Sequence, residues 1–204
     1  TEAYIDNIGC FSNDWTHHVR LLDKVFRRLE DNGFTVNPLK CEWGVKETDW
    51  LGYWLTPTVL KPWKKKINAI IQLQLPKTLK EMRSFLGAIN YNKDMRPQRA
   101  HLLKPLTDES GKKPKEFKWT NQMQKAFEEM KALMAAECLM AYPDHNKGFQ
   151  IYTDTSDYQM GAMILQEDKP VMYWSCTLDK AQHNYTTMEK ELLSPIDILN
   201  EFQT

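Results

Sequence analysis

The sequence contains no run of about 18 consecutive apolar residues, and its first residues lack the basic-then-apolar pattern of a secretory signal. These absences argue against membrane insertion and export, so we expect an intracellular protein, cytoplasmic or nuclear, with no membrane partner. Closely spaced cysteines are also missing. The four cysteines form no C-x-x-C pair, which argues against a zinc site and against a disulfide framework.

An initiator methionine is absent too, because the chain begins with Thr1, and it stops at Thr204 within a predicted helix. We therefore expect both ends to be cuts. The 204 residues, of which 42% are hydrophobic, suffice for one ordinary domain or two small ones with a real core.

A net charge is lacking as well, but the zero total conceals a segregation of charge along the chain. Residues 1–60 carry −3, residues 61–118 carry +10 and residues 119–204 carry −7 when lysine and arginine are counted against aspartate and glutamate. An excess of this size favours a polyanion such as nucleic acid as the partner of the middle segment. The lysines within 61–66, taken alone, would be typical of a solvated face.

The first 60 residues predict short strands around one helix. A strand and turn are expected up to Cys10, and apolar residues recur at helical spacing from Asp14 to Leu29. The helix is expected to stop at Asp-Asn-Gly, residues 31–33, because Asn and Gly tolerate the left-handed conformation that follows a last turn. Further strands are predicted at residues 34–36, 41–45 and 50–55.

The middle of the sequence predicts helices. One follows Pro62, a second starts at Thr78 with a T-x-x-E capping box, and a third follows Thr120. Residues 104–118, which contain Pro105 among lysines, are expected to form a loop.

The last 56 residues, 149–204, predict three strands and a helix. The strands are expected at 149–153, 162–166 and 171–175. The helix opens with a second capping box, Thr186 with Glu189. Its predicted apolar stripe consists of Leu192, Leu193, Ile196, Leu199 and Phe202.

Several motifs follow one another along the whole chain. They are Tyr4-Ile5-Asp6-Asn7, Asn37 with Lys40-Cys41, Trp50-Leu51-Gly52-Tyr53, Leu79 to Gly87 with Asn90-Tyr91, Lys104-Pro105-Leu106-Thr107, Phe117-Lys118-Trp119-Thr120, Thr153 to Ala162 and Tyr185 to Leu193. In this order, these segments resemble the polymerase polyprotein of gypsy-type long-terminal-repeat retrotransposons.

The resemblance implies an α+β fold with four parts. Residues 1–60 resemble the C-terminal end of a reverse transcriptase palm with its primer grip, and residues 61–118 resemble the basic helical thumb. Residues 119–148 resemble the connection helix. Residues 149–204 resemble a truncated RNase H-like β-β-β-α unit.

Two catalytic residues are implied in the palm-like part. Polymerases of this family hold two Mg²⁺ or Mn²⁺ ions with carboxylates, and Asp6 matches one ligand, while Asn7 stands where the family pattern Y-x-D-D has a second aspartate. Lys40 matches a lysine that can donate a proton or stabilise charge near the leaving pyrophosphate. By themselves, an aspartate in a turn and a surface lysine are usually structural.

Two carboxylates are implied in the RNase H-like part. Asp154 and Glu191 match the first two of about four metal ligands in this family. Composition alone would describe Glu191 as an exposed helical glutamate. Pro195 departs from the family pattern and removes the hydrogen bond to the Glu191 carbonyl, so we expect a kink there. Arg96 also departs, since the family usually has a large apolar or aromatic residue at this position.

The implied partners are an RNA–DNA hybrid or a template–primer duplex and the remainder of the Pol polyprotein. The predicted nucleic-acid contacts are Trp50, Leu51, Gly52, Lys61, Trp63, Lys64, Lys65, Lys66, Lys80 and Arg83. We expect a reverse transcriptase and RNase H fragment that is catalytically incomplete by itself. The alternatives are a non-catalytic nucleic-acid-binding module and a non-functional genomic remnant.

Overall fold

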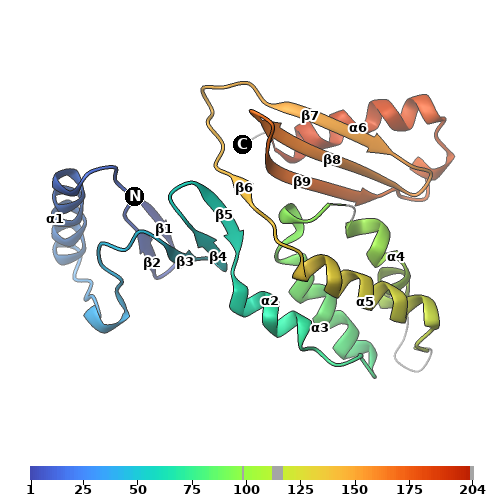
Figure 1. Ribbon diagram of the computed structural model, residues 1–204, viewed down its shortest axis with the longest axis horizontal. Helices are drawn as coiled ribbons and strands as arrows, with labels where there is room; N and C mark the ends of the chain where they lie inside the picture. Colours follow the sequence, from blue (N-terminus) through green and yellow to red (C-terminus); the bar gives the residue numbers. More distant parts are fainter. Residues whose placement is uncertain (98, 112–116, 203–204) are drawn as a thin grey trace.

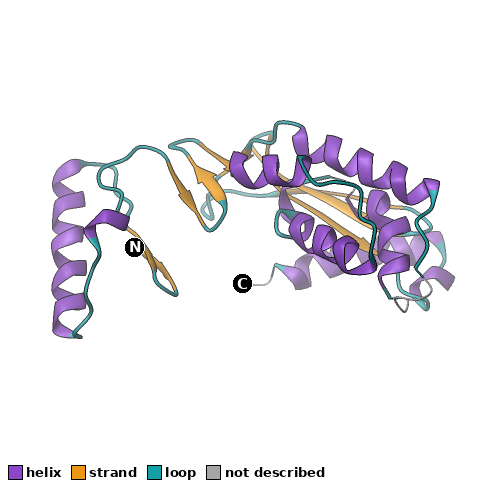
Figure 2. Ribbon diagram, turned by 90° about the horizontal axis from the view of Figure 1, so that it is seen from below, coloured by secondary structure: helices purple, strands orange, loops and turns teal. Residues whose placement is uncertain are grey.

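The computed structural model describes residues 1–97, 99–111 and 117–202. Figure 1 shows the N-terminal helix and hairpin at one end of an elongated molecule, with a helical core and a second, three-stranded sheet at the other end. A small sheet joins the two ends, and Figure 2 shows the same separation from a perpendicular direction. Within the described ranges, no helix is long and apolar enough to cross a membrane.

The N-terminal part consists of a hairpin and one amphipathic helix. Strands β1 (Glu2–Tyr4) and β2 (Asn7–Gly9) are antiparallel and turn at Ile5 and Asp6. Helix α1 (Trp15–Asp31) starts at an Asp14 N-cap and has no buried residue. Its apolar face is only partly covered, because Leu22, Val25 and Leu29 are half-buried, whereas Trp15 and Val19 are exposed.

The strands predicted at 34–36 and 41–45 are wrong. The chain is irregular there, apart from a single 3-10 turn, η1 (Pro38–Lys40). Asn37 caps this turn by accepting from the Leu39 amide, and Pro38 suits a first helical position. Gly44 has a φ of 59°, which lies outside the strand region.

The strand predicted at 50–55 is two strands rather than one. Strands β3 (Thr48–Trp50) and β4 (Tyr53–Leu55) form a hairpin whose turn is Leu51 and Gly52. Strand β5 (Val59–Pro62) and the short β6 (Met140–Ala141) complete a sheet of order β3-β4-β5-β6. This sheet leads directly into the helices.

Four helices share one apolar core. They are α2 (Lys64–Ile71), α3 (Leu79–Asn90), α4 (Arg99–Ser110) and α5 (Asn121–Ala135). The Phe85 and Phe127 rings lie 4.5 Å apart at its centre, surrounded by buried residues that include Ile70, Met82 and Met130. The basic middle segment and α5 thus fold as one unit.

The loop predicted at 104–118 is wrong for residues 104–110, and residues 112–116 of that prediction lie outside the described ranges. Helix α4 continues through Pro105 to Ser110. Leu103 and Leu106 are buried in the shared core. Their burial explains why the helix persists although a proline lacks the amide that would bond four residues back.

The C-terminal part confirms the predicted three strands and helix. Strands β7 (Gln150–Thr155), β8 (Gln159–Gln166) and β9 (Lys169–Thr177) form an antiparallel sheet of order β7-β8-β9. Glu167 and Asp168, with φ angles of 52° and 61°, make the tight turn between β8 and β9. Helix α6 (Thr187–Glu201) covers the sheet, as Figure 1 shows, and begins with the predicted capping box.

Helix α6 includes Pro195, as the predicted helix does. The kink expected at Pro195 stays a prediction. Its predicted stripe packs only in part. Leu193 and Phe202 are half-buried, but Leu192, Ile196 and Leu199 are exposed, whereas Ser194 and Ile198 are buried. The helix face that packs on this sheet is therefore rotated relative to the predicted one.

Candidate nucleic-acid interface

The turn between β3 and β4 is held against α2 and the end of α3. Leu51 and Gly52, which we call the hairpin turn, have φ angles of 48° and 78°. The Gly52 carbonyl accepts a hydrogen bond of 3.2 Å from the Trp63 amide, and the Tyr91 hydroxyl donates to the Leu51 carbonyl. The Lys66 ammonium lies 3.6 Å from the centroid of the Tyr91 ring. The hairpin turn and the start of α2 therefore adjoin one another.

Lys64 and Lys65 are exposed in the first turn of α2. The positive end of the helix dipole lies here, and no acidic residue of this turn offsets it. Trp63, the N-cap residue, provides no side-chain hydrogen bond to the free amides. Among the described residues, no salt bridge holds either lysine. A phosphate would satisfy the free amides and offset the lysine charges together.

The remaining predicted contacts have different surroundings. Lys61 is half-buried in β5 opposite Trp54, whereas Lys80 is exposed in the first turn of α3. Arg83 donates from Nε and Nη2 to the Ser110 carbonyl at 2.9 and 2.6 Å, so it caps the end of α4. Trp50 packs edge-on against Phe11 with ring centroids 6.3 Å apart.

The two palm-like catalytic candidates lie apart on the surface. Asp6 is exposed at the tip of the β1–β2 hairpin, with Asn7 beside it as the first residue of β2. Lys40 is the exposed last residue of η1. The structure joins neither residue to the other by a hydrogen bond, and both roles stay predictions.

Asp154 and Glu191 are exposed on neighbouring elements. The Thr155 hydroxyl lies 3.5 Å from the Lys190 carbonyl, which brings β7 and α6 together at this level. Because side chains alternate along a strand, Asp154 points to the face opposite that of Thr155. A further polar contact joins α6 to the turn after β7, where Lys190 lies 3.1 Å from Asp157 and has a side chain only 8% exposed.

Comparisons with known proteins agree with this arrangement. Residues 1–55 match the family described as reverse transcriptase (RNA-dependent DNA polymerase), and residues 119–204 match the RNase H-like domain found in reverse transcriptase. The chain is 35% identical to the retrovirus-related Pol polyprotein from transposon 297 of Drosophila melanogaster over 94% of its own length. It is 32% identical to the transposon Tf2-7 polyprotein of Schizosaccharomyces pombe over 98% of its length.

The chain belongs to the reverse transcriptase and RNase H-like region of transposon Pol polyproteins. It spans only 18% of the Drosophila relative and 15% of the fission yeast relative.

Solved structures show the same Pol fold. The foamy viral protease-reverse transcriptase in complex with RNA/DNA hybrid superposes with a TM-score of 0.84 at 23% identity, over 94% of this chain and 26% of that one. The same viral protein in complex with dsDNA gives 0.77 at 25% identity, over 92% of this chain and 42% of that one. The expected α+β fold is thereby confirmed.

Reverse transcriptase and RNase H families generally use divalent metal ions. The donors of this Pol segment do not fit a two-metal site. Asn7 offers a neutral amide beside the Asp6 carboxylate. In the part of the chain that the structure describes, no three or more His, Cys, Asp or Glu side chains gather where they could hold a metal ion. Asp6, Asp154 and Glu191 stay predicted Mg²⁺ or Mn²⁺ ligands.

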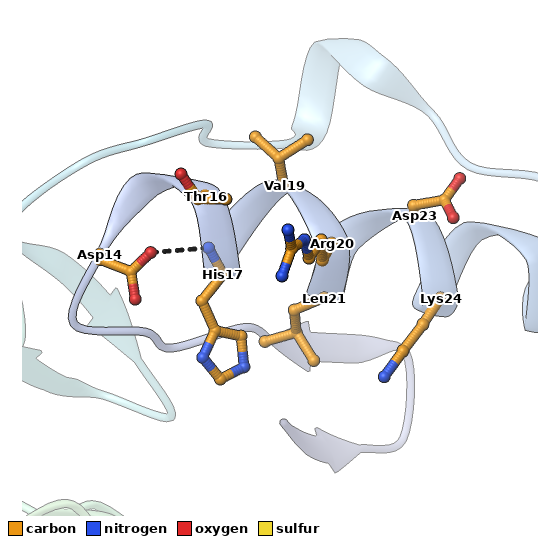
Figure 3. Close-up of a pocket in the computed structure, with 8 residues that line it drawn as sticks. All are labelled: Asp14, Thr16, His17, Val19, Arg20, Leu21, Asp23 and Lys24. Atoms are coloured by element: carbon orange, nitrogen blue, oxygen red, sulfur yellow. Dashed lines mark hydrogen bonds between the residues drawn. The ribbon is translucent and has the colours of Figure 1, made fainter.

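One hollow lies along α1 and not at any predicted site. It has a volume of about 810 Å³ and is lined by residues of one stretch only, between Asp14 and Lys24. Figure 3 shows these side chains on successive turns of the helix, with the Asp14 carboxylate accepting from the His17 amide. A hollow lined by a single helix brings no groups from other elements together, so we assign it no chemistry.

Sequence reasoning missed Tyr91 and Lys190. Tyr91 stands out in the sequence only as part of the Asn90-Tyr91 motif. Nothing in the sequence indicates that its hydroxyl reaches a turn 40 residues earlier. Lys190 reads as a surface lysine in a capped helix. For the turn that Tyr91 contacts, the sequence does offer a signal in Gly52, because a glycine between two apolar segments suggests a tight turn.

Proposed function

We propose that this Pol segment holds an RNA–DNA hybrid or a template–primer duplex through the hairpin turn and the first turn of α2, and that it has no catalytic activity by itself. The observation that supports the proposal is the pair of exposed lysines, Lys64 and Lys65, at the positive end of a helix. No salt bridge among the described residues holds either of them. They lie within the segment that carries a charge of +10.

The chemistry of this surface suits a backbone contact. Lysine ammonium groups bind phosphates without reading bases, so the binding would be independent of sequence and sensitive to salt. Trp63 adds a flat ring beside Lys65, whose ammonium lies 5.5 Å from the ring centroid. The foamy viral proteins with this fold are described in complex with RNA/DNA hybrid and with dsDNA, which supports the same partner class here.

Fluorescence anisotropy with a labelled hybrid and a labelled DNA duplex tests the proposal. We expect Lys64→Ala/Lys65→Ala to weaken binding and to reduce the slope of log K against log salt by about 2, since each phosphate contact contributes about 0.9. The matched control is Lys125→Ala/Lys180→Ala, which removes two exposed positive charges from the acidic C-terminal segment. Equal affinity and slope for both double variants would contradict the proposal.

The same titration separates the two alternatives. A non-catalytic binding module shows salt-dependent affinity for the duplex, whereas a genomic remnant without function shows no measurable affinity in the parent protein. Association with other parts of a Pol polyprotein is proposed on the same basis, because the relatives that match are polyproteins several times longer than this chain.

A further inference from the structure

The three lysines at the start of α2 are not equivalent. Successive residues of an α-helix are rotated by about 100°, so Lys64 and Lys66 lie on nearly opposite sides of α2. Lys64 and Lys65 are exposed, but Lys66 is half-buried and directs its ammonium onto the Tyr91 ring at 3.6 Å. A cation this close to an aromatic face is attracted to it and is withdrawn from solvent.

The hairpin turn fits closely into the space between these two side chains. A Cβ added to Gly52 would meet the Lys66 ammonium and would lie 2.7 Å from Tyr91 Cε1. Gly52 also has a positive φ, 78°, which only glycine adopts readily. The Tyr91 hydroxyl and the Trp63 amide hold the two carbonyls of the turn. Any other residue at position 52 would therefore displace the lysine or the tyrosine.

We propose that Lys66 and Tyr91 are positioning residues, which fix the hairpin turn against α2 and so keep the first turn of α2, with Lys64 and Lys65, in a fixed position relative to the hairpin turn when a duplex is bound. Lys66 makes no phosphate contact. The inference rests on the proposed function for its duplex partner. The contacts of Lys66 and Tyr91 at the hairpin turn, however, are present in the free protein.

A neighbouring contact supports the same attachment. The Tyr53 ring lies 6.0 Å from the Tyr91 ring, and its hydroxyl donates to Asp94 Oδ2 at 3.5 Å. Burial and the nearby Asp94 carboxylate raise the pKa of Tyr53 to about 12. Strand β4 is thus joined to the segment that follows α3, in addition to the contacts at the turn.

The first test compares Lys66→Met with Lys64→Met in the salt titration. Lys64→Met removes a phosphate contact, so the slope of log K against log salt should fall by about 0.9. Lys66→Met should weaken binding at every salt concentration while leaving the slope close to that of the parent. Lys66→Arg keeps a cation over the ring and should restore affinity. An equal fall in slope for Lys64→Met and Lys66→Met would overturn the positioning role.

The second test uses the free protein. Amide hydrogen exchange at Trp63, whose N–H donates to the Gly52 carbonyl, should become faster in Lys66→Met and in Tyr91→Leu. Exchange in Lys64→Met and at the core helix α5 serves as the control for global unfolding. Unchanged Trp63 exchange would overturn the inference even if duplex binding is observed. Faster Trp63 exchange in these two variants, together with no duplex binding by the parent, would support the positioning of the hairpin turn and refute the proposed function.

Discussion

At the scale of single residues, polar groups near the hairpin turn are withdrawn from water and change their acid–base behaviour. The pKa of Tyr53 is raised from 10.0 to about 12, first by burial and then by the Asp94 carboxylate. Burial also raises the pKa of the Cys138 thiol and lowers that of Arg96. These groups connect the hairpin and the segment after α3 to the rest of the core.

The raised pKa of Tyr53 predicts a loss of stability in alkali. The phenol ionises near pH 10 in the unfolded state and near pH 12 in the folded state. As the pH rises above 10, ionisation therefore lowers the free energy of the unfolded state before that of the folded state. Below pH 10 both states are protonated and the shift contributes nothing. We expect the free energy of unfolding to fall less steeply in Tyr53→Phe than in the parent between about pH 10 and about pH 12. Urea unfolding at several pH values measures this, and parallel curves for the two proteins would show that Tyr53 does not titrate as described.

Asp6 gives a prediction on activity. It is exposed, has Asn7 as neighbour, and belongs to no cluster of metal-binding side chains among the described residues. We expect no primer extension on a primed RNA template with Mg²⁺ or Mn²⁺, because a two-metal reaction needs more carboxylates than this turn offers. Extension that disappears in Asp6→Ala, but persists in a control variant such as Asp49→Ala, would refute this expectation.

At the scale of elements, two helices contain an internal proline. In α4, Pro105 is compensated by burial of its neighbours Leu103 and Leu106. In α6, Pro195 is only half-buried, and the helix exposes Leu192, Ile196 and Leu199 to solvent. Helix α6 therefore has less packing to offset its proline than α4 has.

Replacing Pro195 by Ile should stabilise the protein. The substitution supplies an amide for the Glu191 carbonyl and removes the clash of the proline ring, with a gain of up to about 3 kcal/mol. Thermal melts of parent and variant measure the gain as a higher Tm. Pro195→Ala is the matched variant, since it restores the same bond without a large side chain. A midpoint that falls in both variants would mean that the chain around Glu191 is not helical in solution.

At the scale of the whole molecule, the helical core joins segments that the sequence separates. Arg96 is almost fully buried and donates to the Met134 and Ala136 carbonyls at 2.9 and 2.8 Å. It therefore ties the segment after α3 to the end of α5. The Ser175 hydroxyl accepts from the Ala100 amide at 3.3 Å, which links α4 to the RNase H-like sheet. These contacts connect the helical core with the C-terminal unit.

The sequence by itself determined the helices with strong periodicity, the β-β-β-α order of the C-terminal part and the basic middle segment. Local signals decide these features: apolar spacing, capping residues such as Thr186, and the charges themselves. It also indicated the family, through motifs that keep their order along the chain.

Only the tertiary structure decided which residues meet. Residues 104–110 are helical because Leu103 and Leu106 reach a core formed by distant helices, and packing of this kind outweighs local propensity. Lys64 and Lys66 belong to the same run of three lysines, yet Lys64 is exposed and the Lys66 ammonium faces the Tyr91 ring. That difference depends on a tyrosine 25 residues further along the chain, which only folding brings beside the hairpin turn.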